Sequence, residues 1–241
     1  MDRIFEFVGS LLMTICGEEG TLGGAIFLFT AFITLFMLVS IISEIRSLQL
    51  ADHIRPLHEG IVKKLQNKPD QMGKDLIKLH KAFDYNTFLG ISGNLVHIIT
   101  VFFLAGTFLQ AERYLPAFPD GERGLLWIRD MAQSPFSLLL NGSVFPDFLL
   151  AAVSVLLMDY LMSVNSRFII RKSLMPVETL YKCLAWITVL AAFFLPQAIL
   201  AYFIIYYFFK NLILLIYLRF IPYVLNESQQ VIYSEFARKI K

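Results

Sequence analysis

Charged residues are scarce in this sequence of 241 residues. Asp, Glu, Lys and Arg make up 17% of it, against about a quarter in soluble globular domains. Hydrophobic residues account for 57%, and the mean hydropathy is +0.64. The length alone would suit one or two soluble domains, but so little charge cannot cover a soluble surface. The composition therefore predicts one polytopic membrane domain.

Cysteine is also scarce. Cys16 and Cys183 are the only two, and neither lies in a Cys-x-x-Cys or a histidine-rich pattern. We therefore expect no disulfide framework, no metal site and no cofactor. The amino-terminal residues MDRIFEF are acidic rather than basic, which is not typical of a cleaved signal peptide.

The motifs of the common enzyme classes are absent. The sequence has no His-Glu-x-x-His, Gly-x-Ser-x-Gly or P-loop motif. Its four histidines lack the spacing of metal ligands. Asp159 is the only acidic residue deep within an apolar stretch, so no second carboxylate is available for acid–base catalysis. We therefore expect a protein that is not an enzyme.

Long apolar stretches, by contrast, are abundant. Three of them predict single membrane-spanning helices, at residues 24–43, 87–109 and 147–164. Another stretch, residues 183–221, would be roughly 58 Å long as one helix, about twice the ~30 Å hydrocarbon core of a bilayer. It must fold back, and Pro196 is the natural break. We predict a helical hairpin over 179–220 that turns at Pro196, and hence an all-α polytopic membrane protein with five transmembrane helices.

The distribution of basic residues predicts the orientation of these helices. Sixteen of the 21 lysines and arginines lie in the segment 44–86, the loop 165–182 and the tail from Arg219 onward. Four lie in the other loops and the N-terminal segment: Arg3, Arg113, Arg123 and Arg129. Because cytoplasmic loops carry an excess of basic residues, we predict that the N-terminus is outside and the C-terminus is cytoplasmic. The absence of a transit-type N-terminus favours a bacterial plasma membrane.

The remaining segments have amphipathic patterns. Residues 1–23 predict a short extracytoplasmic interfacial helix, residues 110–146 an outer loop, and residues 221–241 a cytoplasmic amphipathic tail. Residues 44–86 predict a basic cytoplasmic helical hairpin, broken at Pro69. This hairpin either contacts substrate or is a solvated coiled coil near anionic lipid. The residues expected to contact substrate are Arg55, Lys63, Lys64, Lys74 and Lys78.

Three short motifs occur among these elements. The outer loop contains Leu126, Trp127, Ile128, Asp130 and Met131. Pro196 is followed six residues later by Tyr202 and Phe203, and Asn86 precedes the second predicted span. In this order and spacing, the chain resembles the YidC/Oxa1/Alb3 family of membrane protein insertases over roughly residues 24–220.

The resemblance is incomplete in the first two spans. Members of that family usually carry an arginine in the first span, which makes an inward-open groove positive; Met37 stands at this position here. Ile42 replaces a proline, and His97-Ile98-Ile99 replaces a Gln-x-Pro motif. The resemblance thus implies the family fold without its groove arginine, as in a specialised paralogue.

Polar residues recur on single helical faces within the predicted spans. An insertase of this type must hold the polar tail of a substrate in a hydrated cavity while the apolar segment enters lipid. Glu44 continues the helical face of the first-span threonines. The predicted groove residues are Thr30, Thr34, Asn94, His97, Asp159, Ser163, Tyr206 and Lys210.

Lys210 is central to this prediction. The helical rise places Lys210, Asp159 and His97 in the middle or inner half of the membrane. We predict that Lys210 supplies the positive charge of the missing arginine and that Asp159 is its counter-charge. The alternatives are that Lys210 snorkels to the inner boundary and that His97 is a hydrogen-bonded packing residue.

These features favour a membrane protein insertase or chaperone. It would take the polar tail of a substrate into a cytoplasm-open hydrophilic groove and release the hydrophobic segment into lipid. The expected partners are newly made membrane proteins and the lipid bilayer, with a ribosome or a translocase as further candidates and no specific nucleic acid. Two alternatives stay open: a non-inserting scaffold or assembly chaperone with the same fold, and a small transporter or channel, although five spans do not divide into two repeats.

Overall fold

The structure of the chain is a computed structural model. It describes residues 2–16, 21–85, 89–110, 130–142, 144–174 and 178–240, with residues 113, 115, 124 and 125. All regular elements in these ranges are helices. They are α1 (Asp2–Cys16), α2 (Leu22–Phe36), α3 (Leu38–Leu65), α4 (Pro69–Ala82), α5 (Leu89–Leu109), α7 (Pro135–Leu140), the π-helical turn η1 (Val144–Phe148), α8 (Leu149–Lys172), α9 (Glu178–Phe194), α10 (Gln197–Phe220) and α11 (Glu227–Ile240).

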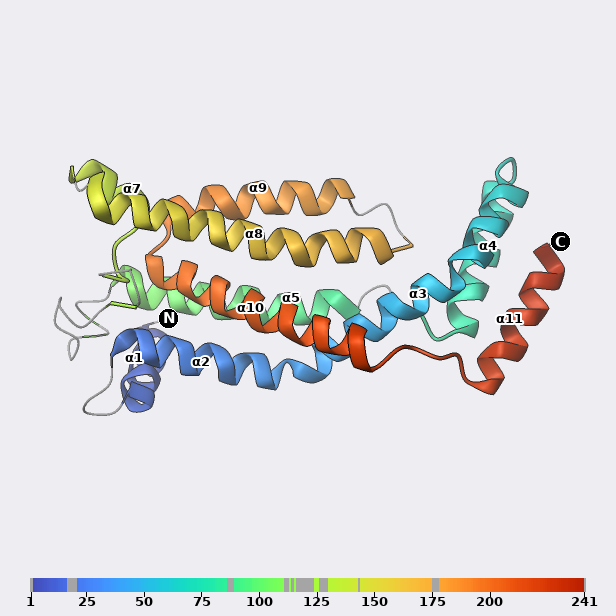
Figure 1. Cartoon of the computed structure of the whole chain (residues 1–241), viewed down its shortest axis with the longest axis horizontal. Coiled ribbons are helices and arrows are strands. Elements are labelled where there is room, and N and C mark those ends of the chain that lie inside the picture. The colour runs from blue at the N-terminus through green and yellow to red at the C-terminus, as the bar shows by residue number, and fades with distance from the viewer. Residues whose placement is uncertain are drawn as a thin grey trace.

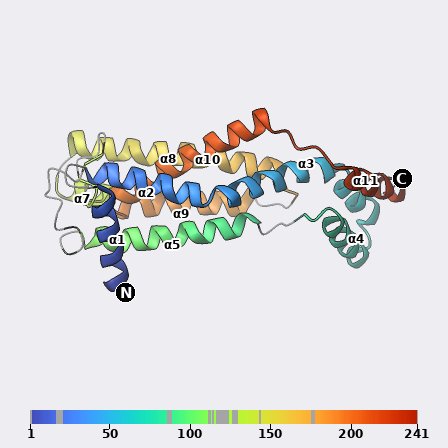
Figure 2. The ribbon, with the colours of Figure 1, turned by 90° about the horizontal axis from the view of Figure 1, so that it is seen from below.

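The helices form an elongated bundle with an extension at one end. Figure 1 shows α2, α5, α8, α9 and α10 along the long axis, whereas α3 continues beyond them to meet α4 and α11. Figure 2 shows α1 crossing the opposite end of the bundle. Helix α10 is central, because it packs against α2, α3, α5, α8 and α9.

Only some of these helices meet the length and hydropathy expected of a membrane span. Pro146–Lys172 and Gln197–Phe220 do so alone, and α2 and α3 do so as a pair that is bent by 54°. Helix α5 has a shorter apolar stretch, Val96–Leu109, and α9 has 17 residues. The described residues therefore contain two or three candidate spans, and the total of five stays a prediction.

The first predicted span, residues 24–43, is interrupted rather than straight. Helix α2 ends at Phe36, and α3 continues from Leu38 to Leu65. The bend contains neither proline nor glycine. In the turns before it, the Thr30 and Thr34 hydroxyls each donate to the carbonyl four residues earlier, at 2.7 Å, and such bonds often bend helices.

Two prolines and an asparagine mark helix boundaries in the structure. Pro196 is the N-cap of α10, and Pro69 is the first residue of α4, where a missing backbone N–H costs nothing. The Asn226 side chain accepts a hydrogen bond from the Gln229 backbone N–H at 2.8 Å and so caps α11. Helix α8, however, extends past the predicted end at residue 164 to Lys172.

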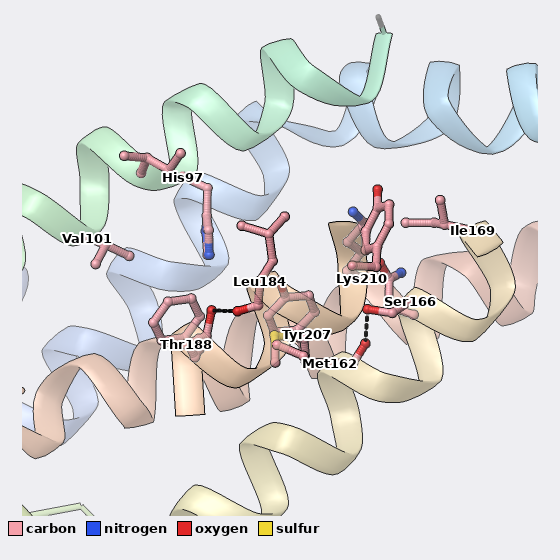
Figure 3. A pocket seen from close by; sticks show the side chains of 14 residues that line it. His97, Val101, Met162, Ser166, Ile169, Leu184, Thr188, Tyr207 and Lys210 are labelled. Atoms are coloured by element: carbon pink, nitrogen blue, oxygen red, sulfur yellow. Dashed lines mark hydrogen bonds between the residues drawn. The ribbon is translucent and has the colours of Figure 1, made fainter. Parts of the chain in front are cut away.

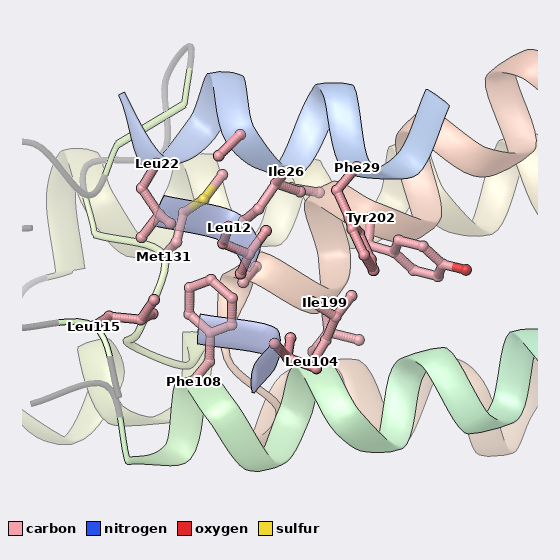
Figure 4. Packing of buried hydrophobic residues seen from close by; sticks show 14 of the residues in the cluster. Leu12, Leu22, Ile26, Phe29, Leu104, Phe108, Leu115, Met131, Ile199 and Tyr202 are labelled. Carbon is pink, nitrogen blue, oxygen red and sulfur yellow. The ribbon is translucent and has the colours of Figure 1, made fainter. Parts of the chain in front are cut away.

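The largest buried cluster joins α1, α2, α5 and α10 near the N-terminal end of the bundle. Leu12, Ile26, Phe108 and Tyr202 meet there and are fully buried (Figure 4). Met131, from the motif of the outer loop, is buried in the same cluster. Its backbone carbonyl accepts from the Ala198 N–H at 2.9 Å, which satisfies one of the unpaired donors at the start of α10. The motif residues 126–129 lie outside the described residues, as does Asn86.

At the other end, α4 and α11 pack on the second half of α3. We call residues 46–82 and 227–240 the distal arm. Its core contains Ile54, Leu57 and Leu79, and α11 adds Phe236 and Ile240. The amphipathic face predicted for the tail therefore lies on the protein's own hairpin.

Helix α11 approaches α3 closely at Gly60. A Cβ atom at Gly60 would lie 2.6 Å from Ile240 Cγ2, whereas one at Gly73 of α4 would meet nothing within 4 Å. We predict that Gly60→Val displaces α11 and that the matched control Gly73→Val does not. Hydrogen exchange of the α11 amides should accelerate about tenfold or more in the first variant only. Equal exchange in the two variants would contradict the docking of α11.

A stacked pair of histidines joins α3 to α4. The rings of His58 and His80 lie 5.8 Å apart with an interplanar angle of 7°. Burial lowers the pKa of both; Glu59 opposes the shift at His58 and Arg55 adds to it, while His58 adds to the shift at His80. Folding therefore favours the neutral rings.

This packing should depend on pH. Since the pKa values are lower in the folded state, the unfolded arm binds more protons, and the stability from these rings is full above about pH 6.5 and is lost as the pH falls. Hydrogen exchange of the α4 amides, corrected for intrinsic rates, should show weaker protection at about pH 5.5 than at about pH 7.5. A His58→Leu/His80→Leu variant should lose this dependence, and its persistence would rule out the histidines as the cause.

Candidate functional site

A buried ion pair joins α10 to α3. The Lys210 Nζ atom lies 3.0 Å from Glu44 Oε2, and the two side chains are 7% and 14% exposed. The predicted counter-charge, Asp159, is therefore wrong. Snorkelling of Lys210 is also wrong, because its amine is held inside the protein. The helical periodicity placed Glu44 on the face of the first span that was predicted to line the groove, but it did not predict that Glu44 pairs with Lys210.

The pair lies next to an apolar cluster at the bend between α2 and α3. Met37, Ile41 and Tyr206 are among its buried members. Met37, at which the resemblance implied the loss of an arginine, packs its thioether against α10. Lys210 brings a buried positive charge to this cluster from α10, and Arg46 of α3 brings a second, exposed one, because its guanidinium donates to the hydroxyl of the cluster residue Tyr217 at 3.1 Å.

A cavity of about 250 Å³ lies on another side of Lys210, between α5, α8, α9 and α10 (Figure 3). Ile98 and Leu184 line it and are 66% and 48% exposed, so the cavity reaches the bundle surface at α5 and α9. Among the described residues that line it, Lys210 is the only one with a formal charge. The described lining residues are His97, Ile98, Val101, Met162, Asn165, Ser166, Ile169, Tyr181, Leu184, Ala185, Thr188, Phe203, Tyr207 and Lys210.

His97 extends from α5 into this region (Figure 3). Its ring lies 4.4 Å from the Tyr206 ring and 5.2 Å from the Tyr202 ring. Its Nδ1 atom is 3.1 Å from the Tyr202 hydroxyl oxygen. His97 is thus a packing residue with one hydrogen bond, through Nδ1, as the alternative interpretation predicted. Its second ring nitrogen, Nε2, is buried and lacks a hydrogen-bond partner among the described residues.

The other predicted groove residues do not line this cavity in the described structure. Thr30 and Thr34 are buried, and their hydroxyls bond to their own helix. Tyr206 is buried beside Met37. Asp159 and Ser163 lie partly exposed on α8. The Asn94 side chain lies outside the described residues.

The polar lining from α8 and α9 was not predicted from the sequence. Asn165 and Ser166 lie just beyond the predicted end of the third span, so they were assigned to a loop. Thr188 is the only hydroxyl-bearing residue in the apolar part of α9, which was a usable signal. Its hydroxyl donates to the Leu184 carbonyl at 2.8 Å.

The basic residues expected to contact substrate lie on the distal arm. Arg55 donates to the carbonyls of Arg171 and Lys172, at 2.9 and 3.0 Å, and so binds the C-terminal end of α8. Lys64 donates to the Lys239 carbonyl at 2.7 Å. The side chains of Lys63 and Lys74 are exposed, and Lys78 pairs with Asp75 at 3.7 Å.

The side chains that line the cavity can bind a polar ligand. No group of three or more potential metal ligands occurs among the described residues. The cavity lining combines one cation, a histidine, an amide and hydroxyl groups with apolar walls. Such a lining can hold a polar chain segment within an apolar bundle.

Comparison with known proteins gives two matches. A family model described as "60Kd inner membrane protein" matches residues 14–227. The chain is also similar to a protein described as membrane protein insertase YidC from Caldanaerobacter subterraneus subsp. tengcongensis. The two are 29% identical over 133 residues, which cover 55% of this chain and 62% of that relative. The chain thus matches less than two thirds of the relative's length.

The ion pair predicts a specific pattern of stability. Glu44→Gln and Lys210→Met should each lower the free energy of unfolding by about 3–5 kcal/mol, because each leaves an unpaired buried charge. The double variant should lose much less than the sum, since no charge remains. Unfolding by SDS in bicelles, followed by circular dichroism, measures this. Asp159→Asn is the control and should change stability by less than about 1 kcal/mol; additive losses in the double variant would contradict the pair.

Proposed function

This chain belongs to the 60Kd inner membrane protein family, the YidC/Oxa1 family, and we propose that it is a membrane protein insertase. In this proposal the cavity beside Lys210 receives the polar tail of a substrate. The apolar segment of the same substrate passes between α5 and α9 into lipid. The expected partners are newly made membrane proteins and the lipid bilayer, with a ribosome or translocase as further candidates.

The observation that carries this proposal is a cavity inside the bundle that reaches the surface and places a few polar groups in mostly apolar walls. Polar groups within a membrane are costly and mark the path of a polar or ionic ligand. Ile98 and Leu184, at the mouth of the cavity, are exposed apolar residues. A substrate segment leaving the cavity there would meet apolar side chains and then lipid, which matches the path that insertion requires.

The proposed orientation has five spans, the N-terminus outside and the distal arm in the cytoplasm. The excess of basic residues in 44–86, 165–182 and the tail supports it. The figures draw the two ends of the chain toward opposite ends of the long axis (Figure 1). In this orientation Lys63 and Lys74 are exposed to the cytoplasm, where they are candidates for contact with substrate.

Insertion into liposomes tests the proposal. The purified protein is reconstituted, and insertion of a single-span test protein is measured by protease protection, with empty liposomes as the baseline. Wild-type protein should insert the substrate well above this baseline. Thr188→Trp should reduce insertion about tenfold or more, because the new side chain fills the cavity.

Ile187→Trp is the matched control, because Ile187 lies next to Thr188 on α9 and is 62% exposed. It should insert as wild type does. If folded wild-type protein adds nothing to the empty-liposome baseline, the insertase proposal fails and a non-inserting scaffold with the same fold becomes the better explanation. Ion flux through sealed liposomes would instead favour a transporter or channel.

A further inference from the structure

The charge at the cavity is already compensated within the protein. Lys210 lines the cavity, and Glu44 lies 3.0 Å from its amine but is not among the lining residues. The carboxylate therefore reaches the amine from α3, while the cavity lies toward α8 and α9. Together the two groups carry no net charge, so the site differs from one with a single unpaired cation.

An acidic group that entered this cavity would find no free partner. To pair with Lys210 it would have to displace Glu44, which is itself buried and would be left unpaired. If Glu44 stayed in place, two carboxylates would lie close together in a region of low dielectric, where like charges repel strongly. The same holds for the phosphate of an anionic lipid.

An uncharged polar group meets no such opposition, and the cavity offers it a partner. His97 is 7% exposed, and its Nε2 atom lacks a hydrogen-bond partner among the described residues. Its Nδ1 atom is 3.1 Å from the Tyr202 hydroxyl, and aromatic rings of α10 hold its ring in place. In either neutral tautomer, Nε2 has one hydrogen bond to give or accept.

We propose that this cavity selects substrate tails whose polar groups are uncharged amides or hydroxyls, that His97 Nε2 binds such a group, and that Glu44 excludes acidic tails. This rests on the proposed insertase function and names its substrate class. His97 is then the residue that binds the polar group of the tail. Glu44 is the specificity-determining residue of the site, although it does not line the cavity.

The test compares single-span substrates that differ only in the tail. One tail carries two glutamines and the other two glutamates at the same positions. With wild-type protein in liposomes, the glutamine tail should insert roughly tenfold better, because entry of the acidic tail leaves a buried charge unpaired. An equal or better insertion of the glutamate tail, above the empty-liposome baseline, overturns this inference and leaves the proposed function standing.

Variants of Glu44 and His97 test whether these two residues cause the preference for the glutamine tail. Glu44→Gln keeps the shape of the side chain and leaves Lys210 as an unpaired cation, so the preference should shift toward the glutamate tail. His97→Phe keeps an aromatic ring beside Tyr206 and should lower insertion of the glutamine tail, while His97→Gln, which retains a hydrogen-bonding group, should restore part of it. A glutamine preference that neither Glu44→Gln nor His97→Phe changes would overturn these assignments.

Two further controls cover misfolding and loss of function. If Glu44→Gln does not fold, the exchanged pair Glu44→Lys/Lys210→Glu replaces it in the test. This variant keeps the ion pair and the net charge, so it should keep the preference for the glutamine tail. A reversed preference in this variant overturns the role of net charge. If neither tail inserts above the empty-liposome baseline with folded wild-type protein, the insertase function fails, and this inference fails with it.

Discussion

A charge buried between apolar helices is stable only beside an opposite charge. This constraint requires α3 and α10 to pack so that their two charged side chains meet. Glu44 and Lys210 meet at 3.0 Å with little exposure to solvent. Glu44 must therefore face α10, although it lies on a helix that leaves the bundle. The bend at Met37 turns the chain between α2 and α3 just before this residue. Lys210 lines the cavity, whereas its partner Glu44 does not.

The aromatic side chains of α10 shape the rest of the site. Tyr202, Phe203 and Tyr206 surround the His97 ring, with the nearest centroid at 4.4 Å. Tyrosine combines an apolar body with a polar tip, so Tyr202 and Tyr206 pack the bundle and still offer hydroxyl groups, whereas Phe203 adds only its apolar ring. Asn211 adds a polar contact between helices, since its amide donates to the Leu161 carbonyl of α8 at 2.9 Å. A polar interior is thus built from residues that also pack well.

Helix α3 connects this interior to the distal arm. It runs without a break from Leu38 to Leu65 and carries Glu44 near one end and the contacts with α4 and α11 near the other. Arg55, between them, binds the last carbonyls of α8. The same helix therefore carries both the contacts of the distal arm and the counter-charge of Lys210. The arm and the cavity are parts of one connected structure rather than separate modules.

Hydropathy, proline and capping residues determined much of the fold from the sequence alone. The breaks at Pro196 and Pro69 and the cap at Asn226 follow from backbone geometry and local hydrogen bonds, and the motif order pointed to the family that the comparisons confirm. The tertiary structure decided which carboxylate meets Lys210, where the first span bends and what covers the amphipathic tail. Each of these depends on contacts between residues far apart in the chain. Such contacts depend on how whole helices pack, which local periodicity does not specify.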